Sequence, residues 1–99
     1  MKCAFLIMGP FNPQQDHGEI ADGLAQIVGV SSLEEACQTA VRLEQAGVEC
    51  FELCGAFGPE GAKAVIEATG GRVPVGYVTH LREQDLLYHQ VFGDPIRED

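Results

Sequence analysis

Short apolar runs separated by polar segments predict strands near the start of the chain. Residues 2–8 and 25–30 are two such runs, each of a length that suits a strand buried on at least one side. Between them, residues 11–23 are rich in Pro, Gln, Asp and Gly, a composition that predicts a loop. The chain is therefore expected to begin with a strand, a loop and a second strand.

Two helices follow from the periodicity of the apolar positions and from their end signals. Apolar residues recur at helical spacing between positions 33 and 43, and Ser32 with Glu35 has the spacing of a capping box before them. Gly47 marks the end of this helix. A second helix is expected from Pro59, which suits the first turn, to Gly70.

The complete pattern predicts an α/β fold of order β-loop-β-α-β-α-β. Strands at 48–54 and 73–79 flank the second helix, which gives a small four-stranded, mostly parallel sheet with two main helices. We expect a Rossmann-like or half-barrel-like sandwich of two or three layers. Residues 1–99 form a single predicted domain, in which 80–92 is a helix or an extended arm and 93–99 is a flexible polar tail.

The direction of the two crossovers decides how the sheet is covered. Parallel crossovers are right-handed, so two crossovers that step in the same direction place both helices on one face. The other face must then be buried by the segment after His80 or by a second subunit. A reversal of direction would instead cover both faces, as in doubly wound folds. Because two helices cover four strands thinly in either case, we predict a homo-oligomer, most simply a dimer.

Charge and cysteine content exclude some classes of partner. Six Lys and Arg against fifteen Asp and Glu give a net charge of −9, which disfavours both nucleic acid and anionic membrane surfaces. The first residues lack the long apolar stretch of a signal peptide or a membrane span. We therefore expect a cytoplasmic protein whose four cysteines stay reduced.

Candidate ligand-binding residues lie where the predicted strands end. Ligands of open parallel sheets bind beyond the carboxyl ends of the strands, and this edge collects Ser31 with the glycine-rich turn Gly55, Phe57 and Gly58. The turn lacks the Lys and Ser/Thr of a phosphate loop and the spacing of a dinucleotide fingerprint, so no cofactor is expected. The alternative is a tight strand-to-helix turn without a ligand.

Three residues form a candidate catalytic set at the same edge. Glu52 could transfer protons if it is buried, and Cys54 could act as a nucleophile beside His80 if the last two strands are neighbours. The alternatives are a solvated glutamate, a small buried cysteine and a hydrogen-bonded histidine. No spacing of Cys and His in the sequence is that of a metal site.

One stretch of the chain resembles a known family. The residues Glu52-Leu53-Cys54-Gly55, Phe57-Gly58 and Val73-Pro74-Val75-Gly76 are similar to those of short prokaryotic proteins classed as a domain of unknown function, over the range from Lys2 to about His80. The resemblance implies a compact α/β architecture and singles out positions 52–58, but it implies no reaction. The same order of elements is also similar to one repeat of a (β/α)₈ barrel, which 99 residues cannot close.

Two functions are compatible with these patterns. The first is the binding of a small molecule, an anion included, or a minor enzymatic activity at the carboxyl ends of the strands. The second is a non-catalytic, homo-oligomeric structural or interaction module, in which the unusual residues serve folding and assembly.

Overall fold

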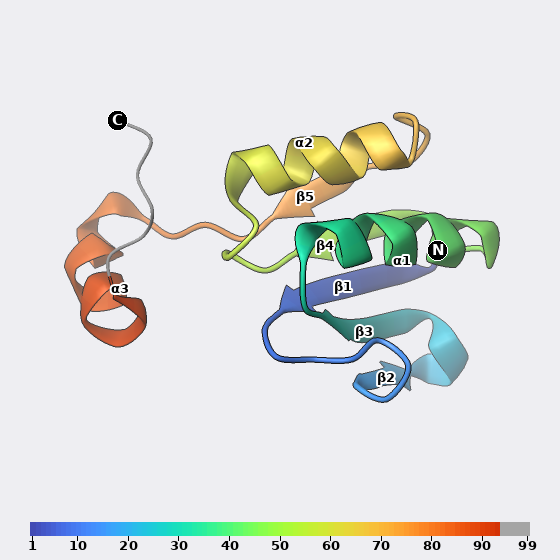
Figure 1. Cartoon of the computed structure of the whole chain (residues 1–99), viewed down its shortest axis with the longest axis horizontal. Helices are drawn as coiled ribbons and strands as arrows, with labels where there is room; N and C mark the ends of the chain where they lie inside the picture. Colours follow the sequence, from blue (N-terminus) through green and yellow to red (C-terminus); the bar gives the residue numbers. More distant parts are fainter. Residues whose placement is uncertain (94–99) are drawn as a thin grey trace.

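Five strands form one sheet, and two helices pack on one of its faces (Figure 1). The structure is a computed structural model of the chain, and residues 1–93 are described. In chain order the elements are β1 (Cys3–Met8), β2 (His17–Ile20), the 3-10 turn η1 (Ala21–Gly23), β3 (Ala25–Val30), α1 (Leu33–Gln45), β4 (Cys50–Leu53), α2 (Gly58–Ala68), β5 (Val75–Tyr77), the 3-10 turn η2 (Arg82–Gln84) and α3 (Asp85–Phe92).

The strand order in the sheet is β2-β3-β1-β4-β5. Strands β3, β1, β4 and β5 run parallel, which confirms a mostly parallel sheet. The first predicted strand, β1, lies between the second and third predicted strands, β3 and β4, while the last two predicted strands, β4 and β5, are neighbours. Strand β1 is therefore the central strand, and Phe5 pairs with Ile27 on one side and with Glu52 on the other.

The prediction of four strands is wrong because the predicted loop contains a fifth. Residues 17–20 form β2, an antiparallel edge strand whose side chains are mostly exposed. The sequence of β2 has no apolar alternation that would identify it as a strand. Its pairing with β3 is reinforced nearby, where the amide of Gly29 donates to the carbonyl oxygen of Asp16 at 2.8 Å. Backbone hydrogen bonds to β3, rather than buried side chains, therefore stabilise β2.

The two main helices begin where their end signals predicted. The Ser32 hydroxyl accepts a hydrogen bond from the amide of Glu35 at 3.1 Å, and the Glu35 carboxylate accepts one from the amide of Ser31 at 2.7 Å. These bonds satisfy free donors in the first turn of α1. In α2, Pro59 occupies the first turn. Gly47, with φ of 106°, follows α1 in a conformation that glycine adopts without strain.

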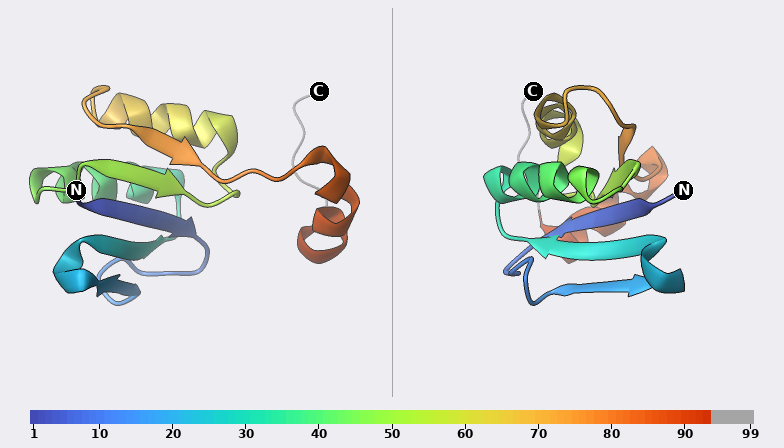
Figure 2. Two further views of the ribbon diagram at one scale, coloured as in Figure 1. Left: turned by 180° about the vertical axis from the view of Figure 1, so that it is seen from behind. Right: turned by 90° about the vertical axis from the view of Figure 1, so that its right-hand side faces the viewer.

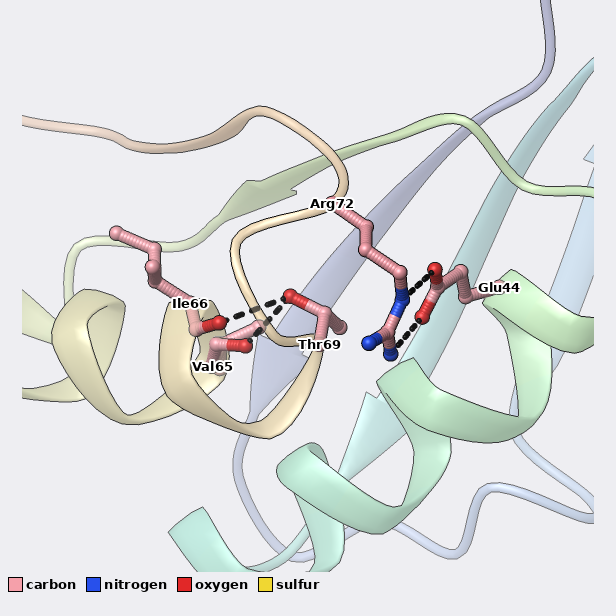
Figure 3. A network of polar contacts seen from close by, with 5 residues as sticks. All are labelled: Glu44, Val65, Ile66, Thr69 and Arg72. Atoms are coloured by element: carbon pink, nitrogen blue, oxygen red, sulfur yellow. Dashed lines mark hydrogen bonds and ion pairs between the residues drawn. The ribbon is translucent and has the colours of Figure 1, made fainter.

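The hydrophobic core lies between the sheet and the two helices. Its fully buried large side chains include Leu6, Val30, Phe51, Leu53 and Val65. Thr69, at the end of α2, is also fully buried, and its hydroxyl donates to the carbonyl oxygen of Val65 at 2.9 Å (Figure 3). The buried hydroxyl of Thr69 is therefore satisfied by its own helix.

Both crossovers step in the same direction, so no helix within residues 1–93 lies over the opposite face of the sheet. The connection from β3 to β4 passes over β1, and the connection from β4 continues to β5 at the edge. Viewed from behind, the strands lie in front of the helices (Figure 2). The exposed fractions of Phe5, Ile20 and Ile27 are 43%, 70% and 45%. We call this surface the open face. Because α1 and α2 both pack on the other face, the fold is a two-layer sandwich.

The expectation that all four cysteines are reduced is wrong for two of them. Cys3 and Cys50 pair directly in the register of β1 and β4, with Cα atoms 4.8 Å apart, and they form a disulfide. Adjacent positions on paired strands bring the two residues within the separation that a disulfide requires. Cys37 and Cys54 are free, and burial raises the pKa of the Cys37 thiol.

Among residues 1–93, no helix is both long enough and apolar enough to cross a bilayer. The predicted cytoplasmic location stays a prediction, and the disulfide removes reduced cysteines as an argument for it. The ambiguous segment 80–92 contains η2 and α3. Of the predicted polar tail, residues 94–99 lie outside the part of the chain that the structure describes.

One ion pair joins the end of α1 to the loop after α2. The Arg72 guanidinium donates two hydrogen bonds to the Glu44 carboxylate, at 2.7 and 2.9 Å (Figure 3). The hydrogen bond from Arg72 lowers the pKa of the Glu44 carboxyl below its ordinary value. The bidentate geometry fixes the position of the loop that leads into β5.

Removal of the disulfide should lower stability substantially. A bond that closes a loop over 47 residues stabilises the folded state by about 4 kcal/mol through the entropy of the unfolded chain. We expect the double variant Cys3→Ala/Cys50→Ala to show a free energy of unfolding lower by about 2–5 kcal/mol in urea denaturation. Equal midpoints for the variant and the oxidised protein would contradict this prediction.

Substitution of Arg72 by Ala should destabilise the protein in a pH-dependent way. Because the folded-state pKa of Glu44 is lowered from 4.5, the stabilising contribution is complete above that pH and is lost as the pH falls through the folded value. The difference in melting temperature between Arg72→Ala and wild type should therefore shrink in acid.

The matched control is Lys63→Ala, which removes an exposed pair with Glu60 at 3.5 Å and should have little effect at neutral pH. A melting-temperature difference for Arg72→Ala that stays constant from neutral pH to strong acid would contradict the assigned role of Glu44.

Candidate functional site

Glu52 lies on the open face, near the end of β4. Its side chain is exposed, and in the sheet it is flanked by Phe5 of β1 and Gly76 of β5. A Cβ atom added to Gly76 would lie 2.8 Å from Oε1 of Glu52, so the carboxylate rests over a position that only glycine leaves free. Among residues 1–93, Glu52 has no salt-bridge partner. The structure thus presents an accessible, unpaired carboxylate on a largely apolar face.

Cys54 lies at the end of the same strand but has different neighbours. Its amide donates to the carbonyl oxygen of Leu6 at 3.0 Å, and its Sγ accepts a hydrogen bond from the amide of Met8 at 3.3 Å. The side chain packs against the hydrophobic core. Cys54 lies one residue beyond β4, which ends at Leu53, and its thiol has other neighbours than the Glu52 carboxylate.

His80 lies beyond the sheet, in the segment that leads to α3. Its Nε2 is 2.6 Å from Oδ1 of Asp85, and its ring stacks on that of Tyr88 with centroids 3.8 Å apart. The described contacts thus give Glu52, Cys54 and His80 separate neighbours, and a joint catalytic role for them stays a prediction. Within residues 1–93, no three His, Cys, Asp or Glu side chains are grouped as a metal ion would require.

The predicted ligand-binding residues already have contacts within the chain. The Ser31 amide and hydroxyl both donate to Oε1 of Glu35, at 2.7 and 2.8 Å. Phe57 is buried, and a Cβ added to Gly61 would lie 2.9 Å from the Cβ of Phe57. These contacts match the alternative of a tight strand-to-helix turn.

The two glycines of that turn have different surroundings. A Cβ added to Gly55 would lie 3.5 Å from the carbonyl oxygen of Val78, whereas Gly58, with φ of 61°, has open space around it. A role for Gly55 or Gly58 in holding a ligand stays a prediction.

A hollow on the open face was not predicted from the sequence. It has a volume of about 230 Å³, and it lies between β1, β3 and β2. Its lining consists of Phe5, Gly18, Glu19, Ile20, Ala25, Gln26 and Ile27. One wall of this hollow is β2, and the sequence predicts a loop at that place. The sequence around Phe5 gave no signal for it, because residues 3–8 are apolar without alternation.

The second exposed apolar surface is the C-terminal arm, which we define as residues 78–93. It contains η2 and α3, and it projects beyond the carboxyl ends of the strands (Figure 1). The two exposed residues Leu87 and Val91, one turn apart, lie beside the aromatic rings of Tyr88 and Phe92. A hollow of about 200 Å³ is lined by Gln84, Leu87, Tyr88, Val91 and Phe92. Within the described chain, the main packing partner of α3 is η2 rather than the sheet.

Comparison with known proteins gives one family match. A family of unknown function, DUF6506, matches residues 1–93. The match extends past His80, where the resemblance in the sequence was expected to end, and it leaves the prokaryotic origin and the motif untested. No curated protein matches the chain, and no solved structure does. Since the match covers more than nine-tenths of the chain, the protein belongs to this family of unknown function.

Proposed function

We propose that the protein is a self-associating interaction module and that the open face of its sheet binds a second copy of the chain. The observation that carries this proposal is the exposure of Phe5, Ile20 and Ile27 on the face opposite the helices. Exposed apolar side chains that are contiguous on one surface mark interaction sites more often than isolated ones do.

Charge distribution supports the same proposal. The chain carries a net charge of −9, so two copies repel each other wherever acidic surfaces meet. Among the strand positions that point to the open face, Glu52 is the charged one; the others are apolar side chains or glycine. This face is therefore the part of the sheet where a like molecule can approach with little repulsion.

The size of the face hollow favours a protein side chain over a small molecule. Pockets for small ligands have volumes of about 300–1,000 Å³, and the hollow on the open face has about 230 Å³. Apolar side chains line most of it. A side chain from another polypeptide suits a hollow of this kind.

A substitution on the open face should weaken self-association. We expect sedimentation equilibrium to give a mass twice the chain mass of 10.6 kDa. Ile27→Asp should raise the dissociation constant by about tenfold or more, which is about 1.4 kcal/mol, because it places a carboxylate at the centre of the interface.

The matched control is Ile66→Asp on α2, where the wild-type side chain is 39% exposed but lies on the helical side of the molecule. This variant should associate like wild type. A monomer at every concentration up to about 1 mM, or equal weakening by both variants, would overturn the proposal.

Glu52 favours binding of a small molecule as a second candidate function. An exposed carboxylate beside Phe5 could hold a ligand with a cationic group and an apolar part, whereas it would repel the anion that the sequence suggested. This candidate requires that the carboxylate is solvated and free in the folded protein.

The variant Glu52→Gln tests that requirement. Because the side chain is exposed and has no ion-pair partner among the described residues, its free energy of unfolding in urea at pH 7 should differ from wild type by less than about 0.5 kcal/mol. A clear gain in stability would show a desolvated carboxylate, and a clear loss would show a paired one. Either result would contradict the second candidate.

A further inference from the structure

We infer that the occupant of the open face is the C-terminal arm of the second copy, so that two chains exchange arms. The inference rests on the proposed self-association and adds the contact that holds it together. Two apolar surfaces of one chain have no cover from residues 1–93: the face hollow and the arm. Since both surfaces are apolar, each can remove the other from water.

The arm has the composition of a segment that is buried in an assembly. Leu81, Leu86, Val91 and Phe92 are between 69% and 76% exposed, although these side chains are apolar. A helix of eight residues with this much free apolar surface is not stable by itself in water. Its stability must come from packing against another surface.

The arm is also preorganised for docking. The contact between His80 and Asp85 closes η2 onto the start of α3, and the rings of His80, Tyr88 and Phe92 form a stack with centroid separations of 3.8 and 5.5 Å. A rigid aromatic surface loses little conformational entropy on binding. The stack therefore holds three rings of the arm together as one surface, while the helix that carries two of them gains its full stability only by packing against a partner.

The position of the arm favours a partner copy over its own sheet. The arm leaves from β5 at one edge, whereas the hollow lies between β1, β3 and β2 toward the other edge. Strands β5 and β3 are three positions apart, which is about 14 Å. Residues 78–81, between β5 and η2, span about 14 Å only when they are fully extended. If the arm folded back onto its own sheet, residues 78–81 would have to be fully extended for η2 to reach the hollow.

Reciprocal exchange closes the assembly at two chains. If the arm of each chain covers the open face of the other, both faces and both arms are buried by one two-fold arrangement. The arm also carries Arg82, which has no salt-bridge partner among residues 1–93, and the open face carries the unpaired Glu52. Opposite charges on the two surfaces support their pairing.

Photo-crosslinking between isotopically distinct copies tests the exchange. The photoreactive residue p-benzoylphenylalanine replaces Phe92, which is 76% exposed, in a chain of natural isotope composition. This chain is unfolded and refolded in a mixture with wild-type chain labelled with ¹⁵N. Mass spectrometry then identifies the captured peptide and shows from its mass which chain supplied it. The control carries the same photoreactive residue in place of Ile66 on α2.

Capture of the peptide that contains Phe5, Ile20 and Ile27 from the ¹⁵N-labelled chain is the expected result, with no such capture by the control. With the ¹⁵N-labelled chain in large excess, so that dimers of two photoreactive chains are rare, capture of the same peptide mainly from natural-isotope chain would show that the arm folds back, and it would overturn the inference. Capture of a labelled arm, or no capture by a protein that sediments as a dimer, would also overturn it while leaving the proposed self-association intact. A protein that sediments as a monomer would overturn both.

Discussion

The handedness of parallel crossovers determines most of what is distinctive about this structure. A right-handed connection from β3 to β4 and another from β4 to β5 place α1 and α2 on the same side, because both connections advance toward the same edge. The core forms only on that side. Within residues 1–93 no helix covers the opposite face, although its strands carry large apolar side chains there. The handedness of the crossovers thus determines which face of the sheet the two helices leave exposed.

Much of the fold could be predicted from local signals. The capping interaction between Ser32 and Glu35 and the glycine at position 47 are short-range features, and the structure shows both where they were expected. The β-α-β-α-β order followed from the same signals. The position of β1 in the centre of the sheet could not be predicted, because it depends on pairings with residues more than 20 positions away.

The features that were missed share a physical cause. Strand β2 is stabilised by backbone hydrogen bonds at an edge, and its residues carry no apolar pattern. The disulfide depends on the register between β1 and β4, which places Cys3 opposite Cys50. For the candidate site, Glu52 was correctly placed near a strand end, but the orientation of the Cys54 thiol depends on a bond to Met8 in another strand. Long-range register, rather than residue type, decides each of these cases.

The central place of β1 has a consequence for how the chain acquires its fold during synthesis. Of the five strands, β1 leaves the ribosome first, and it needs neighbours on both sides. Its second neighbour, β4, is complete only at Leu53. Until then the nascent chain exposes an apolar strand with one edge unpaired, and the pairing that closes the sheet spans a long stretch of sequence. Such distant contacts slow folding and prolong the time during which aggregation competes with it. The interval before β4 pairs with β1 is therefore a period in which the nascent chain is open to aggregation.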